Sequence, residues 1–215
     1  MTPVARRLHA VGRGLHPRAE RSTCQLAHSS AGVENQCAES RLAELGATHR
    51  SATPGWAPLV YLASGMGFSA QERAGSLPAL VAALQAVGCR VFEPFTMNGE
   101  NANAKQEQPP GWAYRIGQAD MQAVRDCDAV FCCANMNPPD EGAMIELGAA
   151  IALHKKTFIF RDDFRSCAGA EDFPLNLMIF TGLPQEGWRD YYYTDITQIG
   201  DRHKALARWV AGENV

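Results

Sequence analysis

The sequence predicts an α/β protein built on one doubly wound, parallel sheet. From residue 58 onward, short apolar runs of strand length alternate with longer segments that have helical periodicity. Glycine or proline marks several of the boundaries between them. The 215 residues suit one domain of ordinary size with an extension, and are too few for two large domains.

Residues 1–55 differ in composition from the rest of the chain. They hold seven of the 20 Lys and Arg residues but only four of the 23 acids, and they show no extended apolar period. We therefore expect a low-order extension over 1–55, with a short helix at Ser40–Leu45, before a domain over 56–215. The first 33 residues resemble an organelle transit peptide. A non-functional extension or a misplaced start codon is favoured instead, because Pro17 would interrupt an amphipathic helix.

The first half of the domain should alternate strand, helix, strand and helix. Apolar runs predict the strands, and apolar residues at helical spacing predict the helices. The expected elements are the strand Leu59–Ser64, a helix over 70–87 ended by Gly88, the strand Arg90–Phe95, a loop from Thr96 to Gly111, and the helix Trp112–Cys127.

The second half continues the alternation. The expected elements are the strand Ala129–Ala134, the helix Gly142–His154, the strand Thr157–Phe160, a fifth strand around Leu177–Phe180, a segment at Tyr191–Thr194, and a final helix near Gln198–Ala211. Five strands alternating with helices favour a parallel sheet in the flavodoxin-like order 2-1-3-4-5.

In such a sheet, ligands bind beyond the carboxyl ends of the strands that flank the switch point, here strands one and three. Ser64–Ser69 and Asn135–Glu146 follow these two strands. We therefore expect the functional site to be formed by these segments.

Composition argues against several classes of protein. The formal net charge is −3 and no dense Lys/Arg stripe occurs, so nucleic acid is not the expected partner. No apolar run approaches the roughly 20 residues that cross a bilayer, so no membrane partner is expected. The seven cysteines contain no CxxC pair, which argues against a disulfide framework or structural zinc and favours a reducing compartment, the cytoplasm.

Glu146 is the strongest single candidate for chemistry. The segment from Gly142 to Leu153 is apolar on every side except at Glu146, so the helix should be buried and carry this carboxylate with it. A buried carboxylate is costly, and a nucleophilic or acid/base role is a common reason to keep one. The alternative is a structural role, pairing with an Arg or capping a neighbouring loop.

Other acids near these segments are open to two interpretations. Asp140 fits an N-cap as well as a functional role, and Asp120 is undecided because helices often carry exposed Asp. Asp128 most simply closes the helix-to-strand turn. Gly142 in the first turn would let a ligand approach the backbone closely.

Ser64–Ser69 only partly matches a dinucleotide-binding loop. The third glycine of GxGxxG is missing and Phe68 stands where the helix should begin, although Glu93 is placed where a ribose-binding acid would lie. A tight loop that shapes a small-molecule pocket is favoured. Phe68 and Trp112 would either stack on a ligand or pack in the core.

Four blocks of the chain resemble the nucleoside 2-deoxyribosyltransferase family. They span about 120 residues and occur in the family's order: Val60–Gly65, Asp120–Val130, the signature Asp140-x-Gly142-x-x-x-Glu146-x-Gly148-x-Ala150, and Pro174–Met178 with its Asn-x-Met segment. Any one block is weak evidence, but the four together are fairly specific.

The resemblance implies a flavodoxin-like enzyme of nucleotide salvage that exchanges the base of a 2'-deoxynucleoside. Glu146 would be the nucleophile that forms a covalent deoxyribosyl ester, Tyr61 would hydrogen-bond to it, and Asp120 and Asp140 would assist proton transfer. The resemblance, together with the expected ligand position beyond the strand ends, implies a set of substrate-binding residues: Ser64, Gly65, Phe68, Gly142, Asn176 and Met178. A Thr96–Gly111 lid would exclude water, although a plain surface loop fits equally well.

The implied partners are a nucleoside and a free nucleobase, with no metal or organic cofactor. A homo-oligomer is implied as well, because Asn176 and Met178 often act across a subunit interface in this family. The C-terminal Gly212–Val215 lacks the aromatic residue that some members place in a neighbouring site.

Two alternatives stay open. One is an N-glycosidase that hydrolyses nucleosides or 5'-monophosphates with the same Glu146. Ser64 and Ser69 would supply hydroxyls to a phosphate, but no Lys or Arg follows the first strand before Arg73. The other is a non-catalytic nucleotide-binding module, which the Asp140/Glu146 pair disfavours.

Overall fold

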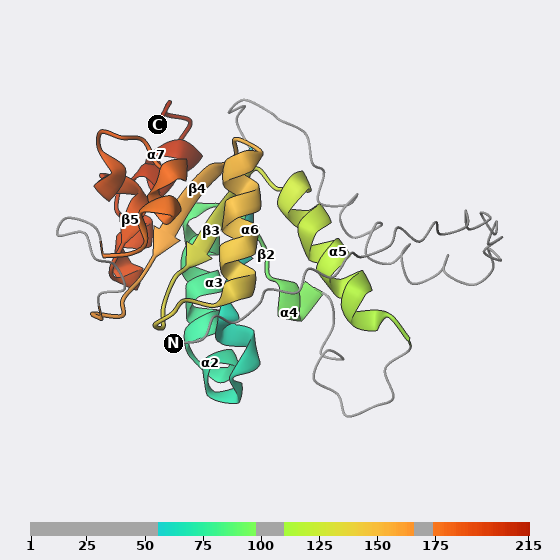
Figure 1. The fold of residues 1–215 in the computed structure, drawn as a ribbon. Coiled ribbons are helices and arrows are strands. Elements are labelled where there is room, and N and C mark those ends of the chain that lie inside the picture. The colour runs from blue at the N-terminus through green and yellow to red at the C-terminus, as the bar shows by residue number, and fades with distance from the viewer. Residues whose placement is uncertain (1–55, 98–109, 166–173) are drawn as a thin grey trace, which may run out of the picture.

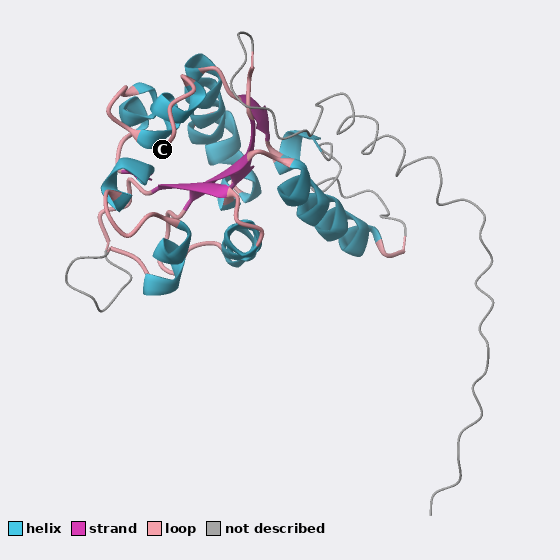
Figure 2. Ribbon diagram, turned by 90° about the horizontal axis from the view of Figure 1, so that it is seen from above, coloured by secondary structure: helices cyan, strands magenta, loops and turns pink. Residues whose placement is uncertain are grey.

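The computed structural model describes residues 56–97, 110–165 and 174–215. Here one parallel sheet runs in the order β2-β1-β3-β4-β5. Its strands are β1 (Leu59–Ala63), β2 (Arg90–Phe92), β3 (Ala129–Cys133), β4 (Lys156–Phe160) and β5 (Tyr192–Tyr193). The predicted flavodoxin-like α/β fold is confirmed, and Figures 1 and 2 show helices on both faces of the sheet.

The helices follow the strands in the expected alternation (Figure 1). The α-helices are α2 (Ala70–Ala74), α3 (Ser76–Val87), α4 (Pro94–Met97), α5 (Trp112–Asp126), α6 (Glu141–Ala152) and α7 (Ala205–Val210). Short 3-10 helices are η1 (Gly65–Phe68), η3 (Leu177–Gly182), η4 (Trp188–Tyr191) and η5 (Ile196–Gly200).

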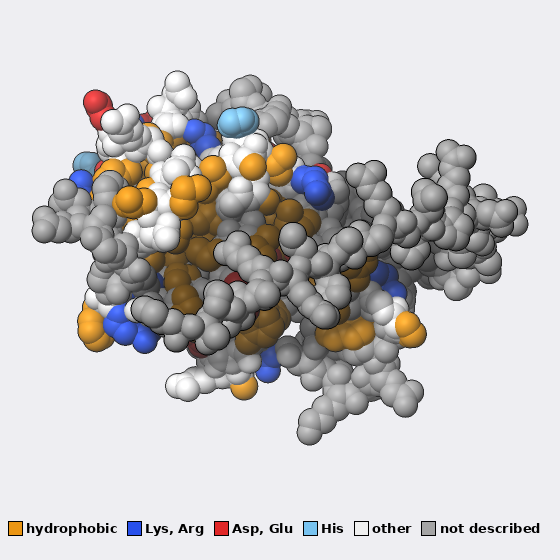
Figure 3. Space-filling model, viewed as in Figure 1, with side chains coloured by type: hydrophobic (Ala, Val, Ile, Leu, Met, Phe, Trp, Pro, Cys, Tyr) orange, Lys and Arg blue, Asp and Glu red, His pale blue; other side chains and the backbone are white. Residues whose placement is uncertain are grey.

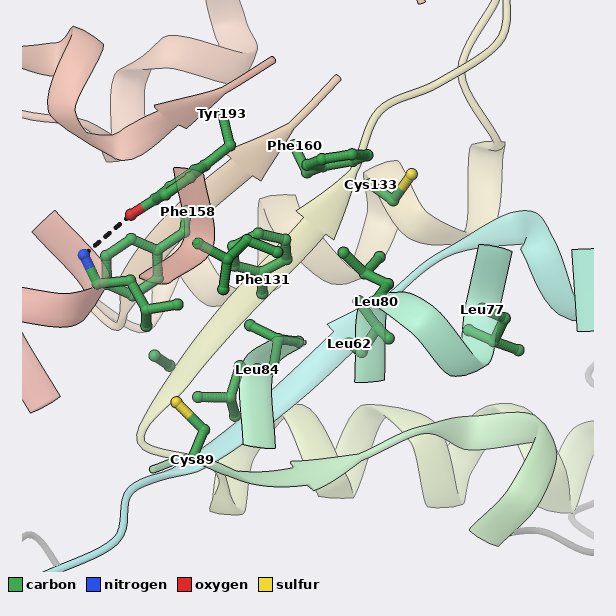
Figure 4. Packing of buried hydrophobic residues seen from close by; sticks show 14 of the residues in the cluster. Leu62, Leu77, Leu80, Leu84, Cys89, Phe131, Cys133, Phe158, Phe160 and Tyr193 are labelled. Carbon is green, nitrogen blue, oxygen red and sulfur yellow. Dashed lines mark hydrogen bonds between the residues drawn. The ribbon is translucent and has the colours of Figure 1, made fainter. Parts of the chain in front are cut away.

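The two faces of the sheet bury different helices. On β1, Val60 and Leu62 join a core with α3 and α7, whereas Tyr61 joins a core with α5 and α6. This alternation is the period of two that a strand imposes. Figure 4 shows the first core, in which the Tyr193 hydroxyl accepts a hydrogen bond from the Leu206 amide at 2.9 Å.

The predicted strand around Leu177–Phe180 is wrong. These residues begin η3, because the Asn176 side chain accepts a hydrogen bond from the Met178 amide and starts a helical turn. The fifth strand is β5, which pairs with β4.

Three predicted boundaries also differ. The second strand ends at Phe92 because Pro94 begins α4. The helix expected over 70–87 divides at Gly75, whose φ of −130° and ψ of −83° are not helical. The final helix near Gln198–Ala211 divides into η5 and α7. Gly88, with φ of 108°, ends α3 as predicted.

Three expectations lie outside the described residues: the low-order extension over 1–55, its helix at Ser40–Leu45, and all but the ends of the Thr96–Gly111 loop. No helix in the described part of the chain is both long and apolar enough to cross a bilayer. On the face shown in Figure 3, the Lys and Arg side chains of the described residues stand apart from one another.

Candidate active site

A cavity of about 260 Å³ lies beyond the carboxyl ends of the central strands. The segment after β1, the short helix α4 after β2, and the helices α5 and α6 all contribute to its wall. The lining residues are Ser64, Phe68, Pro94, Phe95, Trp112, Ile116, Asp120, Asp140, Gly142, Ala143 and Glu146. The cavity therefore combines three carboxylates with an aromatic and apolar wall.

A hydrogen bond between β1 and α6 orients Glu146. Tyr61 is fully buried and faces α6, and its hydroxyl donates to Glu146 Oε1 at 2.6 Å. The two residues are 85 positions apart in the sequence. Glu146 is thus held by a buried donor while it also lines the cavity.

The pKa of Glu146 is raised to about 7, and burial is the largest cause. The negative charges of Asp120 and Asp140 contribute to this rise, whereas the hydrogen bond from Tyr61 opposes it. Burial, and then the charge of Glu146, raise the pKa of Tyr61 well above its usual value. The Tyr61 phenol therefore stays protonated and remains a donor to Glu146.

Asp140 has a structural as well as a cavity-lining position. Its Oδ1 accepts a hydrogen bond from the Ala143 amide at 2.9 Å, which makes it the N-cap of α6. Gly65 lies directly against it, because a Cβ at position 65 would come within 2.9 Å of the Asp140 Cβ. Gly65 thus makes room for Asp140 but does not itself line the cavity.

The helix α5 presents one face to the cavity. Trp112, Ile116 and Asp120 recur every four residues, which places them on one side of the helix. Asp120 lies at one end of this row, where its negative charge raises the pKa of Glu146.

Ser64 and Phe68 line the cavity from the segment after β1. The Ser64 hydroxyl also accepts a hydrogen bond from the Met66 amide at 3.0 Å, and so caps η1. Phe68 is 70% exposed and meets the ring of Phe95 edge to face.

Asn176 and Met178 do not line the cavity of this chain. Asn176 caps η3, and Met178 is 72% exposed. The structure therefore brings together Glu146, Asp120, Asp140, Tyr61, Ser64, Phe68 and Gly142, but not the Asn-x-Met segment.

Of the residues that line the cavity, the sequence did not single out Pro94, Phe95, Ile116 or Ala143. Phe95 follows strand two at the expected edge of the sheet, so the strand-end rule could have suggested it. Ile116 lies midway between Trp112 and Asp120 at helical spacing. Glu93, in contrast, is not part of the cavity, and both its oxygens accept hydrogen bonds from α4.

No three His, Cys, Asp or Glu side chains in the described ranges are grouped so that they could hold a metal ion. The wall combines acidic side chains with flat apolar ones, a combination suited to a small molecule that has a polar and an aromatic part.

A flavodoxin-like sheet with such a cavity at its switch point is typical of α/β proteins that bind small molecules. The sequence model of the nucleoside 2-deoxyribosyltransferase family matches residues 60–178, more than half of the chain. The protein therefore belongs to this family. The four sequence blocks had already indicated a resemblance to it.

Solved structures have the same fold. The 2-deoxyribosyltransferase of the psychrotolerant bacterium Bacillus psychrosaccharolyticus is 23% identical, with a TM-score of 0.50 over 66% of this chain and 90% of that one. The enzyme of the same name from Leishmania mexicana is 19% identical, with a TM-score of 0.51 over 73% of this chain and 99% of that one. No curated protein sequence matches this chain.

Proposed function

We propose that the protein transfers the deoxyribosyl group of a 2'-deoxynucleoside to a free nucleobase. The observation that carries the proposal is the position of Glu146, a carboxylate in the cavity wall oriented by the buried Tyr61 hydroxyl. A carboxylate placed beside C1' stabilises the oxocarbenium-like transition state of N-glycosidic cleavage and can then form a bond to that carbon.

The reaction proceeds in two displacements. Glu146 attacks C1', the C1'–N bond breaks, and its electron pair leaves with the base, which takes a proton from a nearby carboxyl group. Because Oε1 accepts the Tyr61 hydrogen bond, we assign the attack to Oε2. The nitrogen of a second base then displaces Glu146 from C1' and loses its proton, so that two inversions give net retention.

Asp120 and Asp140 are the groups we assign to proton transfer. Both line the same cavity as Glu146, and their charges influence its pKa. A leaving nucleobase needs a proton, and a carboxyl group within reach can supply it and later recover it from the incoming base.

We further propose that the active form is a homo-oligomer in which Asn176 and Met178 serve a neighbouring cavity. Their positions away from the cavity of their own chain and the 72% exposure of Met178 support this proposal.

The test is a chromatographic assay. A mixture of 2'-deoxyinosine and adenine is incubated separately with the wild-type protein, with the Glu146→Gln variant and with the Glu141→Gln variant. Glu141 is an exposed glutamate on the same helix and outside the cavity, which makes it a matched control. We expect 2'-deoxyadenosine from the wild type and Glu141→Gln, and none from Glu146→Gln. Free hypoxanthine as the only product would instead identify a hydrolase, and turnover by Glu146→Gln would exclude the nucleophile assignment.

A further inference from the structure

The ring of Phe95 is held in the cavity wall from two sides. It lies so close to Gly67 that a Cβ at position 67 would come within 1.9 Å of its Cδ2 atom, and only glycine leaves room for it. On another side, the ring of Phe68 meets it edge to face, with centroids 4.9 Å apart and planes at 85°. Both rings line the cavity, so the cavity has an aromatic wall of defined position.

Glu93 holds the backbone that carries this ring. It is 5% exposed, and its Oε1 accepts a hydrogen bond from the Phe95 amide at 3.0 Å. Its Oε2 accepts from the Thr96 amide at 2.8 Å and from the Thr96 hydroxyl at 2.7 Å. Glu93 does not line the cavity, so its influence there passes through Phe95.

The part of the cavity wall that α5 forms is aromatic at one end and acidic at the other. Along α5, the eight residue-to-residue steps from Trp112 to Asp120 span about 12 Å. Asp120, at one end, is close enough to influence Glu146, whereas Trp112, at the other, is apolar and aromatic. A ligand whose sugar carbon lies at Glu146 would extend its planar ring toward the aromatic part.

We propose that Phe95 is the surface on which the nucleobase stacks, and that Glu93 is a positioning residue for it. This inference rests on the proposed function and adds the residues that set affinity for the base. Stacking needs a flat ring that is held in one position. Gly67 packs against the Phe95 ring and Glu93 holds its backbone, so together they fix the position of the ring.

The experiment measures adenine binding by calorimetry and adenine-dependent transfer from 2'-deoxyinosine. Phe95→Leu and Glu93→Gln should each weaken adenine binding about tenfold and raise KM for adenine by a similar factor. The kcat at saturating adenine and its pH profile should not change, because both depend on the carboxylates. Phe95→Tyr keeps a flat ring and should bind adenine as the wild type does. Phe164→Leu, at a position that is 98% exposed, is the matched control.

A second variant covers the case in which Phe95→Leu does not fold, as judged by circular dichroism. Gly67→Ala retains every aromatic residue but displaces the Phe95 ring, and it should weaken adenine binding as well. Unchanged adenine affinity in the folded variants would overturn the inference while transfer by the wild type upholds the function. Weakened affinity without any wild-type turnover would overturn the function alone, and a wild type that does not bind adenine would overturn both.

Discussion

At Glu146, two demands on one side chain conflict. A nucleophile must be ionised, yet burial and two neighbouring carboxylates favour its protonated form and raise its pKa to about 7. The hydrogen bond from Tyr61 acts in the opposite direction and favours the charged form. The balance makes the reactivity of this carboxylate depend on pH close to neutrality.

We therefore expect kcat/KM to fall with unit slope as the pH drops below about 7, because protonated Glu146 cannot attack. Tyr61→Phe removes the hydrogen bond that lowers the pKa, so its acidic limb should move to higher pH. Initial rates measured between about pH 5 and pH 9 test both expectations. A limb near the ordinary glutamate pKa, or one that Tyr61→Phe leaves in place, would contradict the assignment.

The same shift predicts a stability effect. The pKa of Glu146 rises from 4.5 to about 7 on folding, so the folded state binds the proton more tightly than the unfolded state. Wild-type stability should therefore fall as the pH rises from 4.5 through 7. Glu146→Gln keeps an oxygen that can accept from Tyr61 and carries no charge. It should be more stable than the wild type at about pH 8, by up to about 3 kcal/mol.

Urea unfolding of both proteins at about pH 8 and again at about pH 4.5 measures this difference, which should disappear at the lower pH. Glu141→Gln, at an exposed site, should stay within about 0.5 kcal/mol of the wild type at both. An equal effect of Glu146→Gln at the two pH values would indicate a packing change instead of a titration.

At the scale of the element, the N-terminus of α6 combines a cap with a cavity-lining acid. Asp140→Asn retains a side-chain oxygen for the Ala143 amide, whereas Asp140→Ala removes it. We expect Asp140→Ala to lose about 1 kcal/mol of stability and Asp140→Asn to lose little. Both should reduce transfer by roughly 100-fold if the carboxyl group moves a proton. Thermal melts measure the capping role of Asp140, and transfer rates measure its role in proton transfer. Full activity in Asp140→Asn would show that Asp140 serves only as a cap.

The contact of η3 with α6 and β4 depends on a glycine. A Cβ on Gly182 would lie 2.5 Å from Ile151 Cγ1 and 2.7 Å from Thr157 Oγ1, whose hydroxyl donates to the Gly182 carbonyl. Gly182→Ala should therefore destabilise the protein by about 1–3 kcal/mol. Gly117→Ala, inside α5 with no atom within 4 Å of its Cβ, should instead stabilise it by about 0.5–1 kcal/mol. Urea melts of the two variants should shift in opposite directions.

At the scale of the whole molecule, exposed apolar side chains bear on assembly. Ile145 on α6 is 64% exposed, and Leu177 and Met178 on η3 are 55% and 72% exposed. These two helices contact each other. Exposed apolar side chains of this size are costly to leave in water, and burying them between copies would remove that cost.

Met178→Glu should therefore shift sedimentation toward the monomer and reduce transfer with it, because a buried unpaired charge opposes association. Tyr114→Glu introduces the same charge at another exposed apolar position, outside the cavity, and is the control. A wild type that sediments as a monomer and is fully active would contradict the proposed oligomer.

The correct and incorrect predictions have a common basis. The strands around Val60 and Phe131 were predicted correctly because they are buried on both faces and therefore uniformly apolar. The segment from Leu177 was predicted as a strand for the same reason, but the edge of β4 pairs with β5 instead. With only two residues, β5 is too short for its period to be recognised. Strand formation there depends on the available partner, which local pattern does not contain.

By itself, the sequence determined the alternation of the first four strands with their helices and the candidacy of Glu146, which is the one charged residue of α6 beyond its first turn. These follow from periodicity, which is local and therefore visible in the chain. Only the tertiary structure decided that Phe95 lies on Gly67, that Glu93 supports it from outside the cavity, and that Asn176 and Met178 lie away from the cavity of their own chain. Gly67 and Phe95 lie in different elements that only packing brings together, and the bonds from α4 to the neighbouring Glu93 form only where the chain turns into that helix.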